Sequence, residues 1–340
     1  MVIVPLDTGV WDWGAAARAV IRQDGRRCVR FDHAVQSLET VRDVELLEGA
    51  IEADVAVGAE RAFHGVVWRV QTAESYESFF VRPHQVGNAD AVQYTPVFNG
   101  SSAWQLYHGE GFWAPVRFPL EEWFTIRVVF AGDLAEIYVG DLERPALVTT
   151  LRHAPAAGRV GLLVGGPGLK VSRFAVDPDA RPRSGVRPSQ VAIEGAVAEW
   201  YVSDPFEEGT LPDPATRTWT RVDSEPSGLV NLARVNPIRA ARNTVYARAT
   251  LRSERPQRKE LTFGFSDRAL VLLNGALLYR GDATYRSRDY RFLGSIGYWD
   301  TLVLPLQAGD NELAIAVSED FGGWGVQARF ADLDGIVLAT

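Results

Sequence analysis

The sequence is poor in several features that would narrow its class. It holds a single cysteine, Cys28, so no disulfide can form within the chain. No apolar run approaches the roughly 20 residues that a helix needs to cross a bilayer, and a membrane partner is not expected. All but two of the 35 basic residues are arginine, the exceptions being Lys170 and Lys259. We interpret Cys28 as a small buried hydrophobe within a strand.

The overall charge argues against nucleic acid as a partner. The formal net charge is -8 and the pI is about 5.3, so the surface repels phosphate backbones. Hydrophobic residues make up 46% of the 340 residues. A chain of this length and composition is expected to form two domains, each burying its own core without metal or disulfide.

The first residues, Met1–Asp7, carry no signal for export. A basic segment followed by an apolar stretch is missing there. The sequence as given therefore predicts a soluble, cytoplasmic protein, and an exported one if a signal peptide has been removed.

Apolar residues recur with a period of two, which is typical of strands. In Val66–Gln71, Val66, Trp68 and Val70 fall on one predicted face, with Arg69 and Gln71 on the other. Trp13–Val20 is the only helix predicted in the first half. Further strands are expected in the first half at Val44–Val57, Tyr76–Val81, Phe124–Phe130, Ala135–Val139, Leu147–Leu151, Val160–Val164 and Val171–Val176.

A polar, proline-rich segment, residues 177–189, interrupts this rhythm and is interpreted as a linker. The second half then returns to strands, with Asn274-Gly275 predicting a two-residue hairpin turn between Val271 and Leu278. The sequence thus predicts an all-β protein with two antiparallel β-sandwich (jelly-roll) domains, 1–176 and 190–340. Strands of the second domain are expected at Thr244–Leu251, Glu260–Phe265, Ala269–Leu278, Thr301–Leu306, Asn311–Val317 and Gly325–Phe330.

Several segments of the first half resemble a known family of sandwiches. Asp43–Val55, Gly65–Val70 and Tyr76–Pro83 are similar to the early strands of concanavalin A-like lectin/glucanase domains. Glu122–Val129 followed by Ala135–Val139 resembles laminin G-like sandwiches and the bacterial 3-keto-disaccharide hydrolase domain. The resemblance implies the fold, and more loosely a carbohydrate-related function.

The second half resembles a galactose-binding-like jelly roll. The residues that carry this resemblance are Trp200–Phe206, Leu270–Gly275, Gly309–Leu313 and Phe321–Gly325. Such modules bind sugars or pack against a catalytic neighbour, and fold alone does not decide between these roles.

Amide, aromatic and basic residues are dense between Arg69 and Trp113, a mixture suited to a sugar cleft. Alternation places Arg82 and His84 on one face of their strand, and Arg69 and Gln71 would join them if the strands pair. The alternative is a long loop that plugs a sheet edge with its aromatic residues. The predicted carbohydrate-binding residues are Arg69, Gln71, Arg82, His84, Asn99, Trp104, Gln105, Tyr107 and Trp113.

Three functions stay open at this point. The first is carbohydrate binding, and the second is a hydrolase or lyase that acts on a glycoside or modified sugar, with His84, Arg82 and Tyr107 as catalytic candidates. The third is a structural module that contacts other proteins. The resemblance to glucanases implies an E-x-D-x-x-E motif, but Val57 stands where Glu52-Ala53-Asp54 would need its last carboxylate.

Metal binding and a second sugar site are weaker expectations. The histidines lack a zinc spacing, whereas a structural calcium is implied by the family resemblance, with oxygen-rich candidates at Asn88–Asp90 and Ser318–Asp320. Trp299-Asp300 and Glu319-Asp320 with Trp324 form a lesser sugar candidate. The alternative for Trp324 is a core tryptophan packed beneath glycines.

Overall fold

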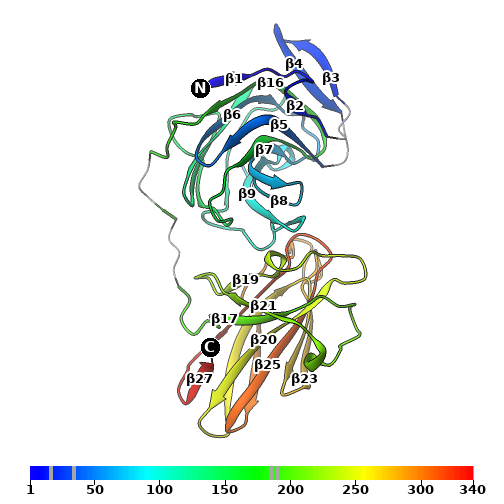
Figure 1. Ribbon diagram of the computed structural model, residues 1–340, viewed down its shortest axis with the longest axis vertical. Helices are drawn as coiled ribbons and strands as arrows, with labels where there is room; N and C mark the ends of the chain where they lie inside the picture. Colours follow the sequence, from blue (N-terminus) through cyan, green and yellow to red (C-terminus); the bar gives the residue numbers. More distant parts are fainter. Residues whose placement is uncertain (15–17, 33–35, 184–186, 189–191, 340) are drawn as a thin grey trace. The chain divides into compact units, whose positions relative to one another are not determined.

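The computed structural model describes residues 1–14, 18–32, 36–183, 187–188 and 192–339. The chain divides into two compact units, Met1–Val97 with Tyr107–Pro188, and Phe98–Leu106 with Ser189–Thr340. The division at Pro188 falls inside the predicted linker. The segment Phe98–Leu106, assigned to the first domain from its sequence position, belongs to the second unit. Figure 1 labels strands of both units.

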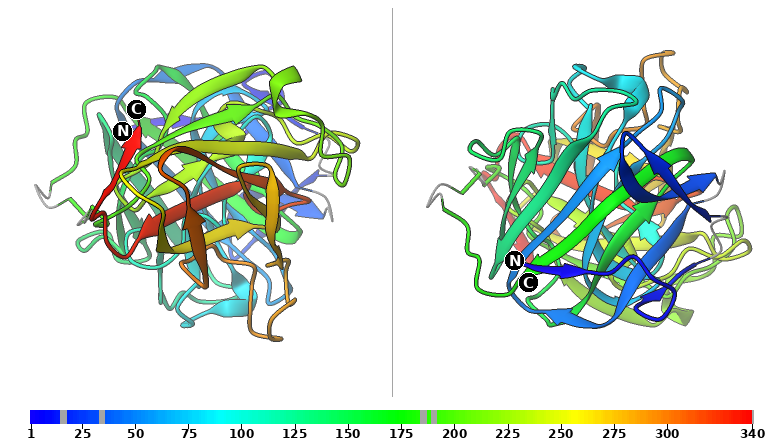
Figure 2. Two further views of the ribbon diagram at one scale, coloured as in Figure 1. Left: turned by 90° about the horizontal axis from the view of Figure 1, so that it is seen from below. Right: turned by 90° about the horizontal axis from the view of Figure 1, so that it is seen from above.

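The first unit consists of two antiparallel sheets around one apolar core. Its first sheet has the order β14-β13-β12-β6-β16-β4-β3, with β1 also paired to β16, and the right view of Figure 2 shows the green β16 flanked by blue strands. The second sheet runs β9-β8-β7-β15-β5-β2, with β11 on β9. The strands of the first sheet are β1 (Val2–Val4), β3 (Arg18–Gln23), β4 (Arg26–Asp32), β6 (Gly49–Ala56), β12 (Phe124–Ala131), β13 (Leu134–Val139), β14 (Leu147–Thr150) and β16 (Pro167–Asp177). Those of the second are β2 (Trp11–Asp12), β5 (Ser37–Leu46), β7 (His64–Thr72), β8 (Ser75–Val81), β9 (Val92–Phe98), β11 (Trp113–Ala114) and β15 (Gly158–Val164), and the short 3-10 helix η1 is Pro83–Gln85.

The second unit is also a sandwich of two antiparallel sheets. The larger sheet has the order β18-β17-β20-β25-β22-β23, with β27 on β20, and the smaller has the order β19-β26-β21-β24. Their strands are β17 (Glu199–Ser203), β18 (Trp219–Asp223), β20 (Thr244–Ser253), β22 (Arg268–Leu273), β23 (Ala276–Asp282), β25 (Gly309–Ser318) and β27 (Ile336–Ala339), then β19 (Leu229–Asn231), β21 (Gln257–Ser266), β24 (Asp300–Leu306) and β26 (Gly325–Phe330). The short elements β10 (Ser101–Ser102), η2 (Pro214–Thr216) and η3 (Leu232–Arg234) complete the described structure.

These sheets confirm the predicted all-β sandwich class. The predicted hairpin turn is also present: Asn274 and Gly275 have φ of 50° and 79° and join β22 to β23. Both positions tolerate a positive φ, which this turn requires. No described helix is long and apolar enough to cross a bilayer.

The predicted helix at Trp13–Val20 is wrong, because Trp13 and Gly14 are not helical and Arg18–Val20 start strand β3. This strand pairs antiparallel with β4, and exposure alternates along it as in an edge strand. Residues 15–17 lie outside the described part of the chain. Pairing with a neighbouring strand has overridden the local helical pattern.

A bulge in β7 changes which side chains share a face. The register between β7 and β8 is regular from His64 opposite Val81 to Trp68 opposite Glu77. It then shifts between Trp68 and Thr72, in the stretch where Arg69 has a φ of +49°. Trp68 consequently packs into the main core, but Val70 joins the cluster on the opposite face of the sheet. The prediction that Trp68 and Val70 share a face is wrong because the bulge inserts a residue into the alternation.

Candidate functional site

The β7–β8 hairpin brings two of the predicted site residues to its open end. Arg82 and His84 follow β8, and Phe63 and Arg61 lie opposite, just before β7. The rings of His84 and Phe63 are 5.6 Å apart in an edge-on arrangement. The guanidinium groups of Arg61 and Arg82 lie 5.6 and 5.7 Å from the Phe63 ring. We call Arg61, Phe63, Arg82, His84 and Asp90 the hairpin-end cluster.

Accessibility differs among these side chains. Arg61 is exposed, Phe63 and His84 are half-buried, and Arg82 is 5% exposed. Arg82 donates to the carbonyl oxygen of Asp90 at 2.5 Å and to Oε1 of Gln93. Arg82 is therefore buried within the cluster and holds it in place. Phe63, His84 and Arg61 are accessible enough to contact a ligand.

The Arg82 hydrogen bonds continue to a second group of predicted residues. Gln93 Nε2 donates to the carbonyl oxygen of Tyr107 at 2.6 Å, and Gln93 pairs with Trp113 between β9 and β11. The half-buried Trp113 ring lies 5.5 Å from that of His108. Tyr107 itself is 1% exposed, with its ring under the guanidinium of Arg152. Its backbone carbonyl accepts the hydrogen bond from Gln93.

Burial sets the protonation of the cluster. Desolvation lowers the pKa of His84, and the positive charges of Arg61 and Arg82 lower it further. Desolvation also lowers the pKa of Arg82 to about 10, so this side chain stays charged at neutral pH. Because His84 is neutral at pH 7, its ring offers one donor and one acceptor. Its Nδ1 is buried and has no hydrogen-bond partner among the described residues.

Arg69 and Gln71 lie at the other end of the same hairpin. In the antiparallel register Arg82 is level with the start of β7, whereas Arg69 is five or six residues along it, roughly 17 Å away at about 3.3 Å per residue. Arg69 is 2% exposed and donates to the carbonyl oxygens of Leu47 at 2.8 and 3.0 Å and of Gly132 at 2.8 Å. Arg69 is thus committed to joining two loops, and it does not share a surface with His84.

Gln71 is exposed, but its amide is also engaged. Its Nε2 donates to the carbonyl oxygens of Ala157 at 2.8 Å and Arg69 at 3.3 Å.

Three other predicted residues, Asn99, Trp104 and Gln105, belong to the second unit. Asn99 donates to the carbonyl oxygen of Ala233 at 2.8 Å. Gln105 is fully buried and donates to the carbonyl oxygen of Leu293 at 2.8 Å. Of the nine predicted residues, six thus belong to the first unit and three to the second. Within the first unit, the pairing of β7 with β8 separates Arg69 and Gln71 from Arg82 and His84.

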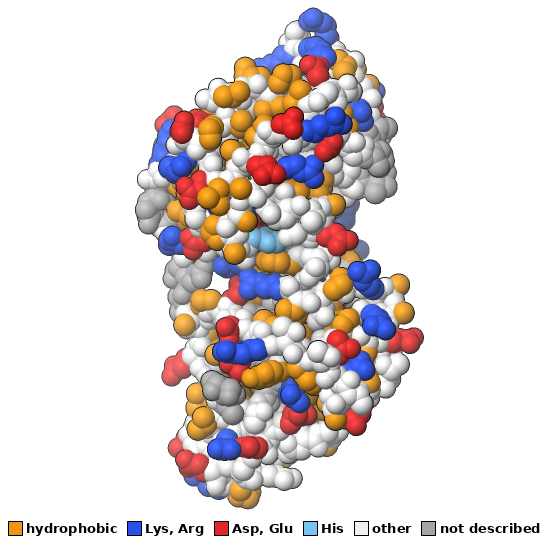
Figure 3. Space-filling model, in the orientation of Figure 1, with side chains coloured by type: hydrophobic (Ala, Val, Ile, Leu, Met, Phe, Trp, Pro, Cys, Tyr) orange, Lys and Arg blue, Asp and Glu red, His pale blue; other side chains and the backbone are white. Residues whose placement is uncertain are grey.

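The carboxylates that invited comparison with glucanases serve a structural role on the first sheet. Glu52 forms ion pairs with Arg127 at 3.3 Å and with Arg173. Asp54 accepts a hydrogen bond from the Thr125 hydroxyl at 2.8 Å. On the face shown in Figure 3, acidic and basic side chains are likewise interspersed across the surface.

The described residues contain no group of three or more His, Cys, Asp or Glu side chains placed to hold a metal ion. At one calcium candidate, the carboxylate of Asp320 accepts from Arg268 at 2.9 and 3.1 Å. At the other, Oδ2 of Asp90 lies 3.8 Å from Nη1 of Arg82. Calcium binding stays a prediction. Trp324 is fully buried and donates to the carbonyl oxygen of Val317 at 3.0 Å, as the core-packing alternative predicted.

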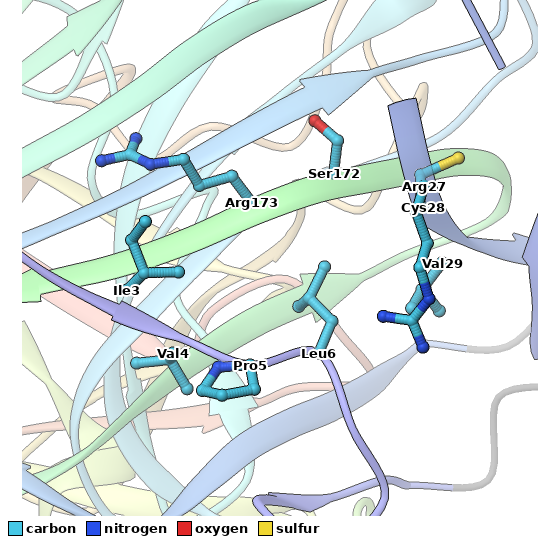
Figure 4. A pocket seen from close by; sticks show the side chains of 9 residues that line it. All are labelled: Ile3, Val4, Pro5, Leu6, Arg27, Cys28, Val29, Ser172 and Arg173. Carbon is cyan, nitrogen blue, oxygen red and sulfur yellow. The ribbon is translucent and has the colours of Figure 1, made fainter. Parts of the chain in front are cut away.

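A pocket of about 280 Å³ opens where β1 and β4 both pair with β16 (Figure 4). Its walls are largely aliphatic, with Ile3, Val4 and Leu6 from β1 and the residues after it. The two arginines at its edge are already paired, Arg27 with Asp7 at 3.3 Å and Arg173 with Glu52. With few free polar groups, this pocket fits a polar ligand less well than the hairpin-end cluster.

Phe63 and Arg61 were missed as site residues, although the sequence contains a signal for them. Counting back from the turn, where Thr72 pairs with Ser75, puts His84 opposite Phe63. The bulge shifts this register by two residues, so that Arg82 is opposite Phe63 and His84 is opposite Arg61. Residue type alone, without counting residues back from the turn, favoured Arg69 as the site residue on β7.

Comparison with known proteins finds only distant similarity to solved structures. No protein-family model and no curated protein sequence matches the chain. Similar solved structures include the carbohydrate-binding module CBM66 from Bacillus subtilis, with 15% identity and a TM-score of 0.36 over 49% of this chain and 92% of that one. Galectin LEC-6 from Caenorhabditis elegans has 12% identity and a TM-score of 0.30 over 47% and 94%. Domain 4 of the extracellular arabinanase AbnA from Geobacillus stearothermophilus has 11% identity and a TM-score of 0.31 over 50% and 78%. These similarities are too distant to transfer a ligand or a site to this chain.

Proposed function

We propose that this protein binds carbohydrate, and that the hairpin-end cluster of the first unit is the binding site. The observation that carries the proposal is the half-buried Phe63 ring, which lies beside the imidazole of His84 and the guanidinium of Arg61. A sugar ring presents an apolar face that stacks on an aromatic side chain and hydroxyls that need donors and acceptors at its edge. The cluster supplies both.

Each side chain has a definite part in this proposal. Phe63 stacks against the sugar ring, Arg61 donates to hydroxyl or ring oxygens, and neutral His84 makes one hydrogen bond to the ligand through Nε2, because its Nδ1 is buried. Arg82 acts from below as a positioning residue, because its guanidinium is held by Asp90 and Gln93. The Trp113–His108 pair is connected to the hairpin-end cluster through Gln93. It offers a further contact for a glycan of more sugar units.

The proposal is tested by glycan-array screening of the whole chain, followed by calorimetric titration with the best ligand. Phe63→Ala and His84→Ala are each expected to weaken binding by on the order of tenfold, since each removes one contact of the size of a stacked ring or a hydrogen bond. Gln71→Ala at the other end of the hairpin is the matched control. It should leave affinity unchanged.

Binding that is unchanged in the Phe63→Ala/His84→Ala double variant would overturn this site. A failure of every glycan to bind, or to raise the melting temperature of the chain, would overturn the function, because a ligand selective for the folded state must stabilise it. Release of product from an oligosaccharide by the wild type, lost in His84→Ala, would assign the hydrolase or lyase alternative to the same cluster.

A further inference from the structure

Three aromatic rings of the second unit lie side by side, with Phe321 next to both of the others. Phe321 lies 6.3 Å from Trp104 and 6.4 Å from Tyr285, measured between ring centroids. Phe321 is 54% exposed, and the other two rings are half-buried. We call these three residues the aromatic platform. Exposed aromatic residues grouped in this way are typical of a binding surface.

The inserted segment Phe98–Leu106 supplies Trp104, and its neighbour Gln105 anchors it. The backbone N–H of Gln105 donates to the carbonyl oxygen of Gly322 at 2.8 Å, and its side chain donates to that of Leu293 at 2.8 Å. Gly322 has a φ of +102°, which L side chains rarely adopt, and a Cβ there would lie 2.1 Å from Oε1 of Gln105, so this position favours glycine. Trp104 is therefore held directly against the loop that carries Phe321.

Two buried carboxylates fix that loop from below. Asp267 accepts a hydrogen bond from the backbone N–H of Asp320 at 3.1 Å, and Glu319 accepts one from that of Gly323 at 3.1 Å. Asp267 is 1% exposed and Glu319 is fully buried. Burying two acids is costly, and here they hold the residues on both sides of Phe321. The ring is thus presented in one position before any ligand arrives, which lowers the entropy cost of binding.

Acidic side chains balance the arginines around the platform, with Glu208, Asp282 and Asp320 beside Arg268 and Arg286. Arg268 bridges Glu208 at 2.7 Å and Asp320 at 2.9 Å. Asp282 accepts from the backbone and hydroxyl of Thr284 at 2.9 and 2.7 Å. Arg286 lies 4.9 Å from the Tyr285 ring, where its donors extend the edge of the platform. With no excess of positive charge, the surface does not select an anion.

We propose that the aromatic platform is a second carbohydrate-binding site, which takes an uncharged oligosaccharide of two or more sugar units. Successive apolar sugar faces stack on Phe321 and its two neighbours, and the guanidinium of Arg286 donates to hydroxyl oxygens at the edge of the platform. Because the platform extends over three rings, it favours an oligosaccharide over a single sugar. This site lies wholly in the second unit and does not rest on the hairpin-end cluster.

The test uses the full chain on an array of neutral and acidic glycans, then calorimetry with the best neutral hexasaccharide at low and high salt. Phe321→Ala and Tyr285→Ala are each expected to weaken this binding about tenfold or more. Tyr290→Ala is the matched control, because Tyr290 is 77% exposed and also has an arginine beside its ring. That variant, and Phe63→Ala in the first unit, should keep wild-type affinity at the platform. The affinity should not change with salt.

The outcomes separate the two proposed sites. Neutral-glycan binding that survives in a Phe321→Ala/Tyr285→Ala double variant but is lost in Phe63→Ala would overturn the platform and support the hairpin-end cluster. A preference for acidic glycans that weakens with salt would overturn the stated ligand class. A concentration-dependent dimer that Phe321→Ala abolishes, with no glycan bound, would show that a second copy covers the platform instead. Unchanged melting curves confirm that the variants fold.

Discussion

Each unit of the protein buries an ionisable side chain whose pKa is shifted mainly by loss of solvent. In the first unit, His64 is fully buried, and desolvation lowers its pKa to about 4. In the second unit, Asp267 is 1% exposed, and desolvation raises its pKa to about 6. Burial favours the neutral form of both groups, which is the acid form of aspartate and the base form of histidine.

The same physical cause therefore gives opposite responses to pH. The unfolded chain takes up a proton on His64 below about 6.5, whereas the folded unit resists it until about pH 4, so His64 removes stability as the pH falls through that window. Folded Asp267 keeps its proton up to about pH 6, whereas the unfolded side chain releases it near 3.8. Asp267 thus removes stability as the pH rises from 3.8 to 6. Glu77, a buried acid of the first unit with a raised pKa, opposes His64, so variants are needed to isolate each residue.

The largest effect on stability is expected from Arg69→Met. Arg69 is buried like His64 and Asp267, but its side chain stays charged, so it extends the comparison to a group that burial does not neutralise. Removing the guanidinium leaves the carbonyl oxygens of Leu47 and Gly132 without their donor. We expect the first unit to lose roughly 3–5 kcal/mol of unfolding free energy. Chemical denaturation should show this loss equally at pH 5 and pH 8. The unfolding transition of the second unit should keep its midpoint. A loss confined to acid pH would contradict the assignment.

His64→Gln is expected to reduce the acid sensitivity of the first unit. The shift of His64 from 6.5 to about 4 corresponds to about 3 kcal/mol of stability lost between those pH values. Glutamine keeps a donor near the carbonyl oxygen of Pro167, 3.1 Å from Nε2 of His64, but does not titrate. Denaturation curves of both proteins from pH 4 to 7 measure the difference. Parallel curves would show that His64 is not the residue responsible.

Asp267→Asn is expected to act on the second unit in the opposite direction. The wild type should lose up to about 3 kcal/mol as the pH rises from 3.8 to 6, whereas the variant should lose less. Asparagine keeps an oxygen to accept from the N–H of Asp320. The remaining slope would report Glu319, whose pKa burial and the nearby Asp267 both raise. An identical pH profile in the variant would contradict the proposed linkage.

The fold class was predictable because strand periodicity and turn residues are local signals. Asn274-Gly275 determines its turn by its own backbone preferences. Arg18–Val20 was not predicted as a strand, because its pairing with β4 is a contact that no local pattern encodes. The inclusion of Phe98–Leu106 in the second unit is similarly non-local. Its anchors, such as Gln105, bond to residues near 293 and 322 in the sequence.

The candidate site was predictable only in part, for a related reason. Arg82 is linked to Trp113 through Gln93, and His84 lies beside Phe63, at the same end of the hairpin. Arg69 was placed on the same surface from alternation alone, which ignores both the hairpin register and the bulge at Arg69. Counting back from the turn separates Arg69 from Arg82 and finds Phe63. The bulge depends on a positive φ at a non-glycine residue, for which this sequence carries no clear signal.

Gln71→Ala is expected to have the smallest effect, and it tests whether the exposed end of the hairpin has any role beyond structure. Its amide bonds to the carbonyl oxygens of Ala157 and Arg69 at an exposed position, where water can replace it. The loss should be about 0.5 kcal/mol or less, and because glutamine does not titrate, the loss should be equal at pH 5 and pH 8. Glycan affinity measured on the same samples should match that of the wild type. A loss of affinity in this variant would place the carbohydrate site at the end of the hairpin where Arg69 lies. The end with Arg82 and His84 would then have the structural role.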